Sequence, residues 1–158
     1  MSCVRIIYYQ IFVYIKNHNI MYSRRKWLEF YRKLGFLLYS IAAVDRHVAP
    51  AERTTLKKEI QTNWLDLEDT ADPFGSDAAF QMEAIFDWLD DADYAPDSAF
   101  NEFEAFVKEN PDFIASSLKE RILLSANRIA FAFHGNNKKE LTLLYQLEQL
   151  LNGSKKSV

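Results

Sequence analysis

At 158 residues, with a formal net charge of −3, the chain has the size of one domain and no overall charge that would select a partner. Its 4 Gly and 4 Pro argue against a turn-rich all-β fold, and its 12 Phe, 8 Tyr and 3 Trp supply much of a core. The lone cysteine, Cys3, excludes an intramolecular disulfide and a cysteine-based metal site. It fits a reducing compartment, so we expect a cytoplasmic protein.

Charges of opposite sign are segregated along the chain. No Lys or Arg lies between Lys58 and Lys108, whereas 14 Asp or Glu fall in that window. The densest basic group is short, at Arg24, Arg25, Lys26, Arg32 and Lys33. An acidic middle repels phosphate, so the sequence argues against a nucleic-acid partner.

Residues 1–20 form a separate N-terminal segment. The run from Ile6 to Ile15 is apolar except for Gln10, but a helix needs about twenty apolar residues to cross a bilayer. No small-residue cleavage site follows it, so a signal peptide is not expected. We interpret residues 1–20 as an extension ahead of a true start at Met21. The alternative is an apolar arm that packs on the domain or makes weak membrane contact through residues 6–15.

From Met21 onward, apolar residues recur at three- and four-residue steps, which predicts helices. The first is expected from about Arg24 to Val44. The second helix should start at Pro50 and run to about Leu67, and a third should follow an N-cap at Ser76. A fourth helix should follow Pro96. A fifth should have Asn110 as its N-cap and Pro111 as its first residue, and a sixth should follow residues 134–137. Residues 21–152 are predicted to be one all-α domain, a compact bundle of about six helices, with 153–158 as a flexible tail. No strand is expected, because no hairpin dipeptide is flanked by alternating apolar residues.

The chain also contains an internal repeat. A shift of 88 residues superposes Ile41 on Ile129, Ala42 on Ala130, Glu52 on Glu140, Thr54 on Thr142 and Leu56 on Leu144. Each copy has a long helix, a short polar turn, a Glu near the next helix start, and an apolar stripe. The sequence therefore predicts two helical hairpins related by a pseudo-repeat.

The segment LLYSIAAVDRHVAPAERTTL, from Leu37 to Leu56, resembles the core hairpin of TerB-like proteins of the tellurite-resistance group. Their pattern is an apolar helix ending in Ala-x-x-Asp-Gly, followed by x-Ile or x-Val, three residues and Glu. This chain has Ala42, Asp45, Val48 and Glu52 at that spacing, with Arg46 where the family commonly has Gly. In the second copy, Phe133 replaces the Asp, and Glu140 retains the Glu. The resemblance implies a compact helical fold linked to bacterial stress or metal-oxyanion resistance, with no catalytic reaction to transfer.

The corner of this hairpin, VDRHVAPAE, carries the first candidate site. Asp45 is expected near the C-terminus of a helix, where the helix dipole disfavours negative charge by about 0.3–1 kcal/mol. The N–H groups at the start of the next helix are one source of compensation. A bound divalent cation is the other, with His47, Glu52 and either Glu140 or His134 completing its ligands.

A second candidate is an acidic face made by Asp87, Asp90, Asp91, Asp93 and Asp97. It is either a solvated surface or a docking site for a basic partner. The spacing of Asp91, Asp93 and Asp97 partly matches a calcium loop, but Pro96 occupies the position where that loop requires Gly. We therefore reject a calcium loop of that type.

Two function classes follow. The first is a non-catalytic interaction or scaffold module that binds another protein in a bacterial stress-response system. The second is a domain that binds a divalent metal ion or a small ligand at the Asp45 and Glu52 corner. An enzyme is not expected, because the sequence has no phosphate-binding Gly loop, no nucleophile elbow and no acid–base pair at a catalytic spacing.

Overall fold

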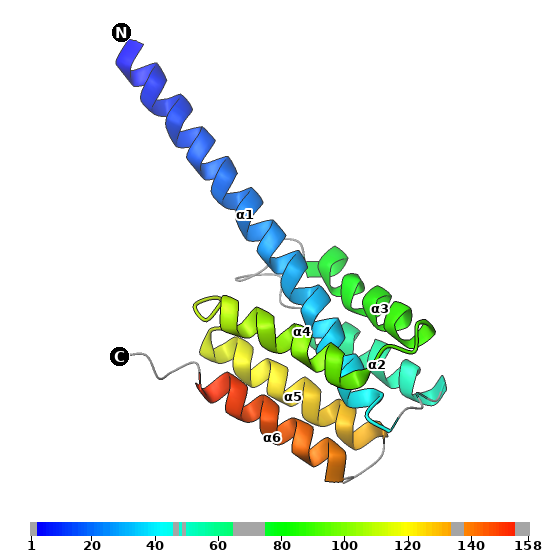
Figure 1. The fold of residues 1–158 in the computed structure, drawn as a ribbon. Coiled ribbons are helices and arrows are strands. Elements are labelled where there is room, and N and C mark those ends of the chain that lie inside the picture. Colours follow the sequence, from blue (N-terminus) through cyan, green and yellow to red (C-terminus); the bar gives the residue numbers. More distant parts are fainter. Residues whose placement is uncertain (1–2, 46–47, 49, 65–74, 134–137, 154–158) are drawn as a thin grey trace.

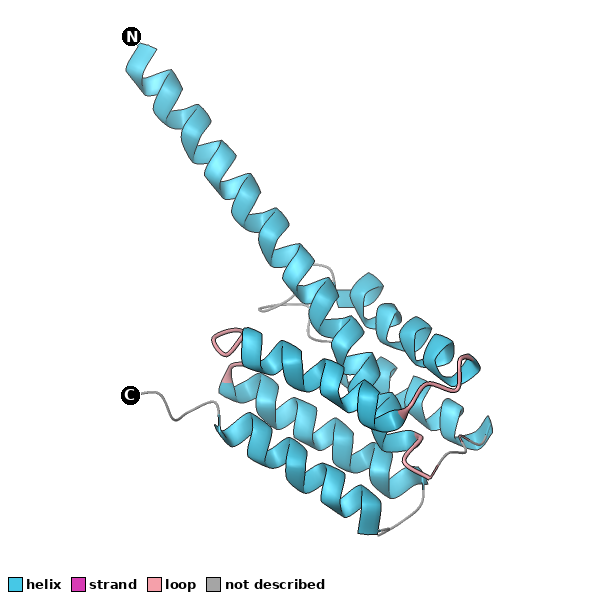
Figure 2. Ribbon diagram, in the orientation of Figure 1, coloured by secondary structure: helices cyan, strands magenta, loops and turns pink. Residues whose placement is uncertain are grey.

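The computed structural model describes residues 3–45, 48, 50–64, 75–133 and 138–153, and over these ranges it contains helices and turns but no strand (Figures 1 and 2). The helices are α1 (Cys3–Ala42), α2 (Pro50–Asn63), α3 (Gly75–Asp91), α4 (Pro96–Glu109), α5 (Ser116–Phe133) and α6 (Lys138–Gly153). The predicted all-α bundle of six helices is confirmed. Leu67, the predicted end of the second helix, lies outside the described residues.

The second half of α1 is the central helix of the bundle. From Leu34 to Ala43 every residue except Phe36 is buried, so this stretch has no solvent-facing side. It packs against α3, α4 and α5, and more lightly against α6 (Figure 1). A helix that is apolar all round is stable in water only when other elements surround it, which is the role of the four helices here.

Gly35 permits the closest of these contacts. A Cβ atom at this position would lie 3.0 Å from the carbonyl oxygen of Met82 and 3.2 Å from the Cβ of Ile85, both in α3. Any side chain would therefore force α1 and α3 apart. Glycine is needed here for close approach of the two helices, at some cost in helix propensity.

Phe30 organises an aromatic cluster at the centre of the core. Its ring centroid lies within 5.5 to 6.0 Å of the centroids of five other aromatic rings, belonging to Trp27, Tyr31, Trp64, Phe106 and Phe113. The members come from α1, the end of α2, α4 and the turn before α5. Tilted and edge-to-face pairs of this kind stabilise the packing beyond the burial of area alone.

Helix α1 begins at Cys3, not near Arg24 as the sequence predicted. Neither Gly nor Pro occurs between Cys3 and Leu34, so nothing breaks the helix in this stretch. The large apolar side chains between Ile6 and Ile15 are 50 to 70% exposed, and Figure 1 shows this part of α1 projecting away from the bundle. It does not pack on the domain.

The predicted start of the fifth helix was also wrong. Asn110 does not cap the fifth helix, because its side-chain amide donates to the carbonyl oxygen of Phe106 at 2.9 Å and its backbone N–H donates to the same oxygen at 3.0 Å. It therefore ends α4, and α5 begins six residues later at Ser116. The break before α4 was predicted correctly, with Pro96 in its first turn. The predicted N-cap at Ser76 was wrong, because α3 begins at Gly75 and Ser76 lies inside the helix.

The two predicted hairpins match in burial but differ in packing. Ile41 and Ile129 are both fully buried, and Ala42 and Ala130 are 0% and 4% exposed. Helix α6 packs beside α5, whereas α2 packs chiefly on α5 and α3. The pseudo-repeat itself stays a prediction.

Phe30→Ala should lower the free energy of unfolding by about 3–5 kcal/mol, because it removes a fully buried ring. Phe12→Ala is the matched control on the same helix, since Phe12 is 65% exposed. It should change the stability by less than about 0.5 kcal/mol. Urea unfolding of both variants measures the difference, and a comparable loss in Phe12→Ala would show that the projecting part of α1 packs on the bundle.

Candidate functional site

The corner predicted from the sequence lies at the end of the bundle where α1 ends. Two contacts join the elements there. The Tyr39 hydroxyl in α1 donates to the carbonyl oxygen of Tyr94 at 2.7 Å, and the Arg53 guanidinium in α2 bonds to the carboxylate of Asp90 in α3. Beside the contact of Tyr39 with Tyr94 lies a cavity of about 230 Å³, which is lined by Tyr39, Ala43, Val48, Asp90, Asp93, Tyr94, Ala95 and Pro96. The end of α1 and the turn between α3 and α4 therefore form one site.

The predicted metal ligands are only partly placed. Asp45 lies half-buried in the turn after α1, and Glu140 lies in the first turn of α6 with 1% of its surface exposed. His47, His134 and the side chain of Glu52 lie outside the described part of the chain. Among the described side chains, no three His, Cys, Asp or Glu gather closely enough to hold a metal ion. A divalent-cation site at Asp45 stays a prediction.

The predicted acidic face divides into two parts. Asp87 and Asp90 are half-buried and face cations of α2. Asp90 bonds to Arg53, and in the neighbouring turn of the same two helices Lys57 Nζ lies 2.9 Å from a carboxylate oxygen of Glu83. The hydrogen bond and charge of Glu83, with a smaller contribution from Asp87, raise the pKa of Lys57. This inner part of the face is neutralised within the molecule.

The outer part consists of Asp91, Asp93 and Asp97, which we call the acidic turn. All three side chains are exposed, and none of them forms an ion pair with a described residue. The backbone of Asp93 adopts a left-handed conformation, with φ of 48°, which Asp and Asn tolerate better than most residues. The acidic turn therefore presents three carboxylates to solvent, and one of them, Asp93, lines the corner cavity.

The acidic turn also acts on Tyr39. Burial raises the pKa of the Tyr39 hydroxyl above its ordinary value of 10.0, and the negative charges of Asp90 and Asp93 raise this pKa further. The hydroxyl therefore stays protonated and keeps its hydrogen bond to the carbonyl oxygen of Tyr94.

Two further depressions lie along α4 and α6. One, of about 450 Å³, lies on the other side of Pro96 and is lined by Val44, Pro96, Asp97, Lys138, Lys139, Thr142, Leu143 and Gln146. The other is a groove of about 740 Å³ whose lining includes apolar Phe100, Val107 and Leu150, with polar Asn101, Glu104, Lys108, Gln146 and Gln149. Neither brings together groups suited to acid–base or nucleophilic chemistry.

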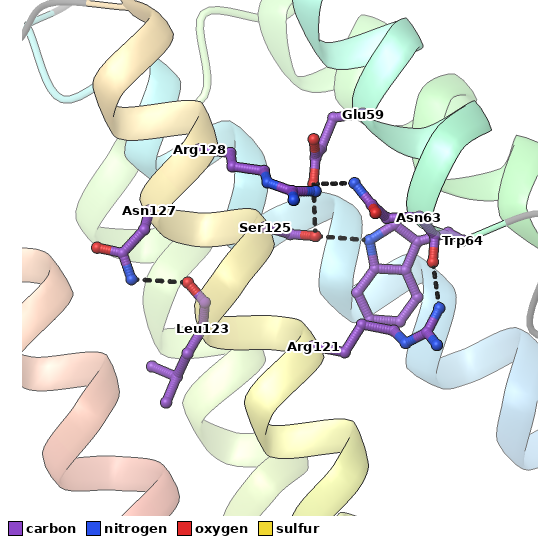
Figure 3. A network of polar contacts seen from close by, with 8 residues as sticks. All are labelled: Glu59, Asn63, Trp64, Arg121, Leu123, Ser125, Asn127 and Arg128. Atoms are coloured by element: carbon purple, nitrogen blue, oxygen red, sulfur yellow. Dashed lines mark hydrogen bonds and ion pairs between the residues drawn. The ribbon is translucent and has the colours of Figure 1, made fainter.

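A polar network that the sequence did not reveal joins α2 to α5 (Figure 3). The indole N–H of Trp64 donates to Ser125 Oγ at 2.9 Å, and the Ser125 hydroxyl donates to Glu59 Oε1 at 3.0 Å. The same carboxylate oxygen accepts from the Asn63 amide at 2.6 Å and lies 3.5 Å from an Arg128 nitrogen. Arg121 donates to the carbonyl oxygen of Asn63, which satisfies the end of α2.

This network stabilises the packing of α2 against α5. Ser125 is 1% exposed and Trp64 is fully buried, so their polar atoms depend on one another for hydrogen bonds. The four-residue spacing of Glu59 and Asn63 was a local signal for a pair on α2. Nothing local pointed to Ser125, which is 66 residues away from Glu59 in the chain.

Ser125→Ala should lower the free energy of unfolding by about 1–3 kcal/mol, because it leaves the buried Trp64 N–H without its acceptor and Glu59 without one donor. Ser117→Ala, at an exposed position of the same helix, is the control and should be nearly neutral. Urea unfolding gives the stability, and the indole N–H chemical shift of Trp64 reports the lost bond. Equal losses of stability in the two variants would contradict a stabilising role for the Ser125 hydroxyl.

Asp93→Asn should lower the pKa of Tyr39 towards 10.0, because it removes one of the negative charges that raise it. Asn tolerates the left-handed backbone at this position, so the turn should persist. Asp97→Asn is the control, because it removes the same charge from the acidic turn and Asp97 is not one of the groups that raise the pKa of Tyr39. A pH titration of tyrosine ring carbons by NMR measures both, and an equal shift in the two variants would refute the assignment.

The sign of the accompanying stability change is fixed by linkage. Because the pKa of Tyr39 is higher in the folded protein than in the unfolded chain, its contribution is complete below pH 10.0 and is lost as the pH rises through the folded-state pKa. Thermal melts between about pH 9 and 11 should show a smaller decline in Asp93→Asn than in the wild type.

No protein-family model matches this chain, and neither does any curated protein or solved structure.

Proposed function

We propose that this chain is a non-catalytic interaction module of a bacterial stress-response system, and that it binds a basic segment of another protein through the acidic turn. The observation that carries the proposal is the contrast within one acidic face. Folding neutralises Asp90 with Arg53, whereas Asp91, Asp93 and Asp97 stay exposed and outside any ion pair with described residues. Unpaired carboxylates clustered on a rigid turn attract a cationic partner and steer its approach.

An exposed aromatic ring beside the acidic turn strengthens the case for an Arg- or Lys-containing partner. Trp88 is 55% exposed, and its ring centroid lies 6.3 Å from that of Tyr94, which belongs to the same turn. The face of an indole attracts a guanidinium or an ammonium group, and aromatic residues dominate the energetics of many protein interfaces. A basic side chain would find both a π face and carboxylates within one small area.

The turn is also held firmly. The bond from Tyr39 to the Tyr94 carbonyl fixes it to α1, and backbone bonds from Asp93 N–H to the Asp90 carbonyl and from Tyr94 N–H to the Leu89 carbonyl close it. A preorganised turn loses little conformational entropy on binding, which favours recognition by a small surface.

The link to a stress response rests on the resemblance of the Leu37–Leu56 segment to TerB-like proteins. That segment forms the end of α1 and the start of α2. Tyr39 and Arg53 in these helices bond to Tyr94 and Asp90, which lie next to the acidic turn. The family-like corner and the proposed binding surface are thus parts of one end of the bundle.

Neutralising the acidic turn should abolish capture of the partner. The variant carries Asp91→Asn, Asp93→Asn and Asp97→Asn, and the control carries Glu109→Gln, Asp112→Asn and Glu120→Gln, which removes the same charge from exposed positions elsewhere. Immobilised proteins are compared for what they retain from bacterial cells at low and high salt. A protein held by the wild type and the control, and lost in the variant and at high salt, is the expected result.

Identical capture by all three proteins would refute the proposal, as would capture that does not depend on salt. Trp88→Ala should weaken retention of the same protein by about tenfold, as expected for loss of a central aromatic contact.

A further inference from the structure

The projecting part of α1, residues 6–19, is an exposed helix that we call the arm. Its large apolar side chains are each 50 to 70% exposed: Ile6, Ile7, Tyr8, Tyr9, Ile11, Phe12, Tyr14 and Ile15. Figure 1 shows the arm leaving the bundle as a direct continuation of the buried part of α1. Apolar surface of this extent on a folded protein marks a place of contact.

The apolar side chains of the arm surround the helix. At about 3.6 residues per turn, Ile7 and Ile11 lie on one side of the helix and Tyr9 lies on the opposite side. Gln10 is the only residue of the run 6–15 whose side chain is neither aliphatic nor aromatic. A helix that is apolar all round is stable in water when neighbours cover it, as they cover the second half of α1.

A bilayer does not suit this arrangement. A helix that lies on a membrane needs a polar side that stays in water, and the run 6–15 has none. None of the described helices is long and apolar enough to cross a membrane. If the arm entered a bilayer end-on, the first turn of α1, with its unpaired N–H groups and Arg5, would lie in the hydrocarbon.

The composition of the arm is that of a protein interface. Lys16 is the only Lys, Arg, Asp or Glu in the arm, whereas 4 of its 14 residues are Phe or Tyr. Depletion of charge and enrichment in aromatic residues distinguish the centres of protein interfaces from other surfaces. The ring of Tyr14 stacks on that of His18, with 5.0 Å between the centroids, which extends the ring-covered surface by one turn.

We propose that the arm binds the arm of a second copy of this chain, with the two helices antiparallel. Every copy carries the same uncovered surface, so two arms cover each other. Eight side chains, each exposed by half or more, offer on the order of 1,000 Å² of apolar surface per arm. A stable interface buries about 800 Å² per partner, so the arm has enough surface for one. Because apolar residues surround the helix, a pair can bind further arms, and the assembly contains at least two copies.

The bundle decides between a parallel and an antiparallel pair. Packed helices lie about 8–10 Å apart. From Leu34 to Ala43, α1 is surrounded by α3, α4 and α5, and α1 runs from the arm into this stretch without a break (Figure 1). The second helix of a parallel pair would run into these neighbours, so the pair is antiparallel.

An antiparallel pair can overlap over the whole run 6–15. The start of α1 in one copy then lies about 13 Å, measured along the helix, from the buried Trp27 of the other copy. Arg5 and Lys16 lie at the ends of the overlap, where water screens their like charges. The two bundles lie at opposite ends of the pair and do not collide.

The mass of the full chain in solution tests the proposal. Sedimentation equilibrium of the wild type should give at least the mass of two chains, and dilution should lower it. Ile11→Ser with Tyr14→Ser should raise the dissociation constant more than about a hundredfold, because each copy loses two apolar contacts. Leu124→Ser with Phe131→Ser changes exposed apolar residues of α5 and should leave the mass unchanged. Circular dichroism should show that the arm variant keeps a folded bundle, because the arm does not pack on it.

Disulfide formation tests the direction of the pair, in a chain that also carries Cys3→Ser. Ile11→Cys lies near the centre of the overlap and should link two copies on oxidation. Ile7→Cys should not, because its two positions lie about 10 Å apart along an antiparallel pair. A mixture of Ile7→Cys with Tyr14→Cys should form a link between the two variants, since these positions lie opposite each other.

Three outcomes would overturn the proposal. One is a wild type that has the mass of a single chain at every concentration, and its sedimentation with phospholipid vesicles would then assign the arm to a membrane. Another is an equal loss of association in the α5 control. The third is linking by Ile7→Cys as efficient as linking by Ile11→Cys, which would show a parallel pair.

Discussion

The architecture depends on burying one helix segment from all sides. Between Leu34 and Ala43, α1 offers no side to solvent except at Phe36, so α3, α4 and α5 must surround it. Each Leu or Ile side chain enclosed there stabilises the fold by about 1.5–3 kcal/mol, which is large against the net stability of a domain. Gly35 sets how closely α3 can approach, and the Phe30 cluster fixes where α2 and α4 meet α1.

Folding recombines charges that the sequence keeps apart. Among the described residues, cations from the two flanks pair with carboxylates of the acidic middle in five ion pairs: Lys33 with Glu102, Arg53 with Asp90, Lys57 with Glu83, Lys108 with Glu104, and Arg128 with Glu59. Each pair is partly exposed and contributes little stability alone. Together they determine which carboxylates remain at the surface. Among the described carboxylates of the acidic middle, those of the acidic turn are the ones that stay exposed and outside these ion pairs.

The fold could be predicted where local signals were sufficient. Three- and four-residue periodicity identified all six helices, and Pro50 and Pro96 marked two helix starts. The role of Asn110 was not predictable, because asparagine caps either end of a helix and only the position of α5 decides between them. The sequence identified the carboxylates of the acidic face. It did not predict that Asp90 is paired with Arg53, because the two residues are 37 positions apart in the chain.

Because α1 is one continuous helix, it fixes the distance between its projecting N-terminal part and the acidic turn. From Ile11 to Tyr39 the helix rises about 42 Å, at about 1.5 Å per residue, with neither Pro nor a hinge between them. The Debye length at physiological salt is only about 8 Å. Charges in the projecting residues 6–19 and charges in the acidic turn therefore neither attract nor screen each other. Helix α1 therefore acts as a stiff spacer, which keeps any surface that residues 6–19 contact about 42 Å from the acidic turn.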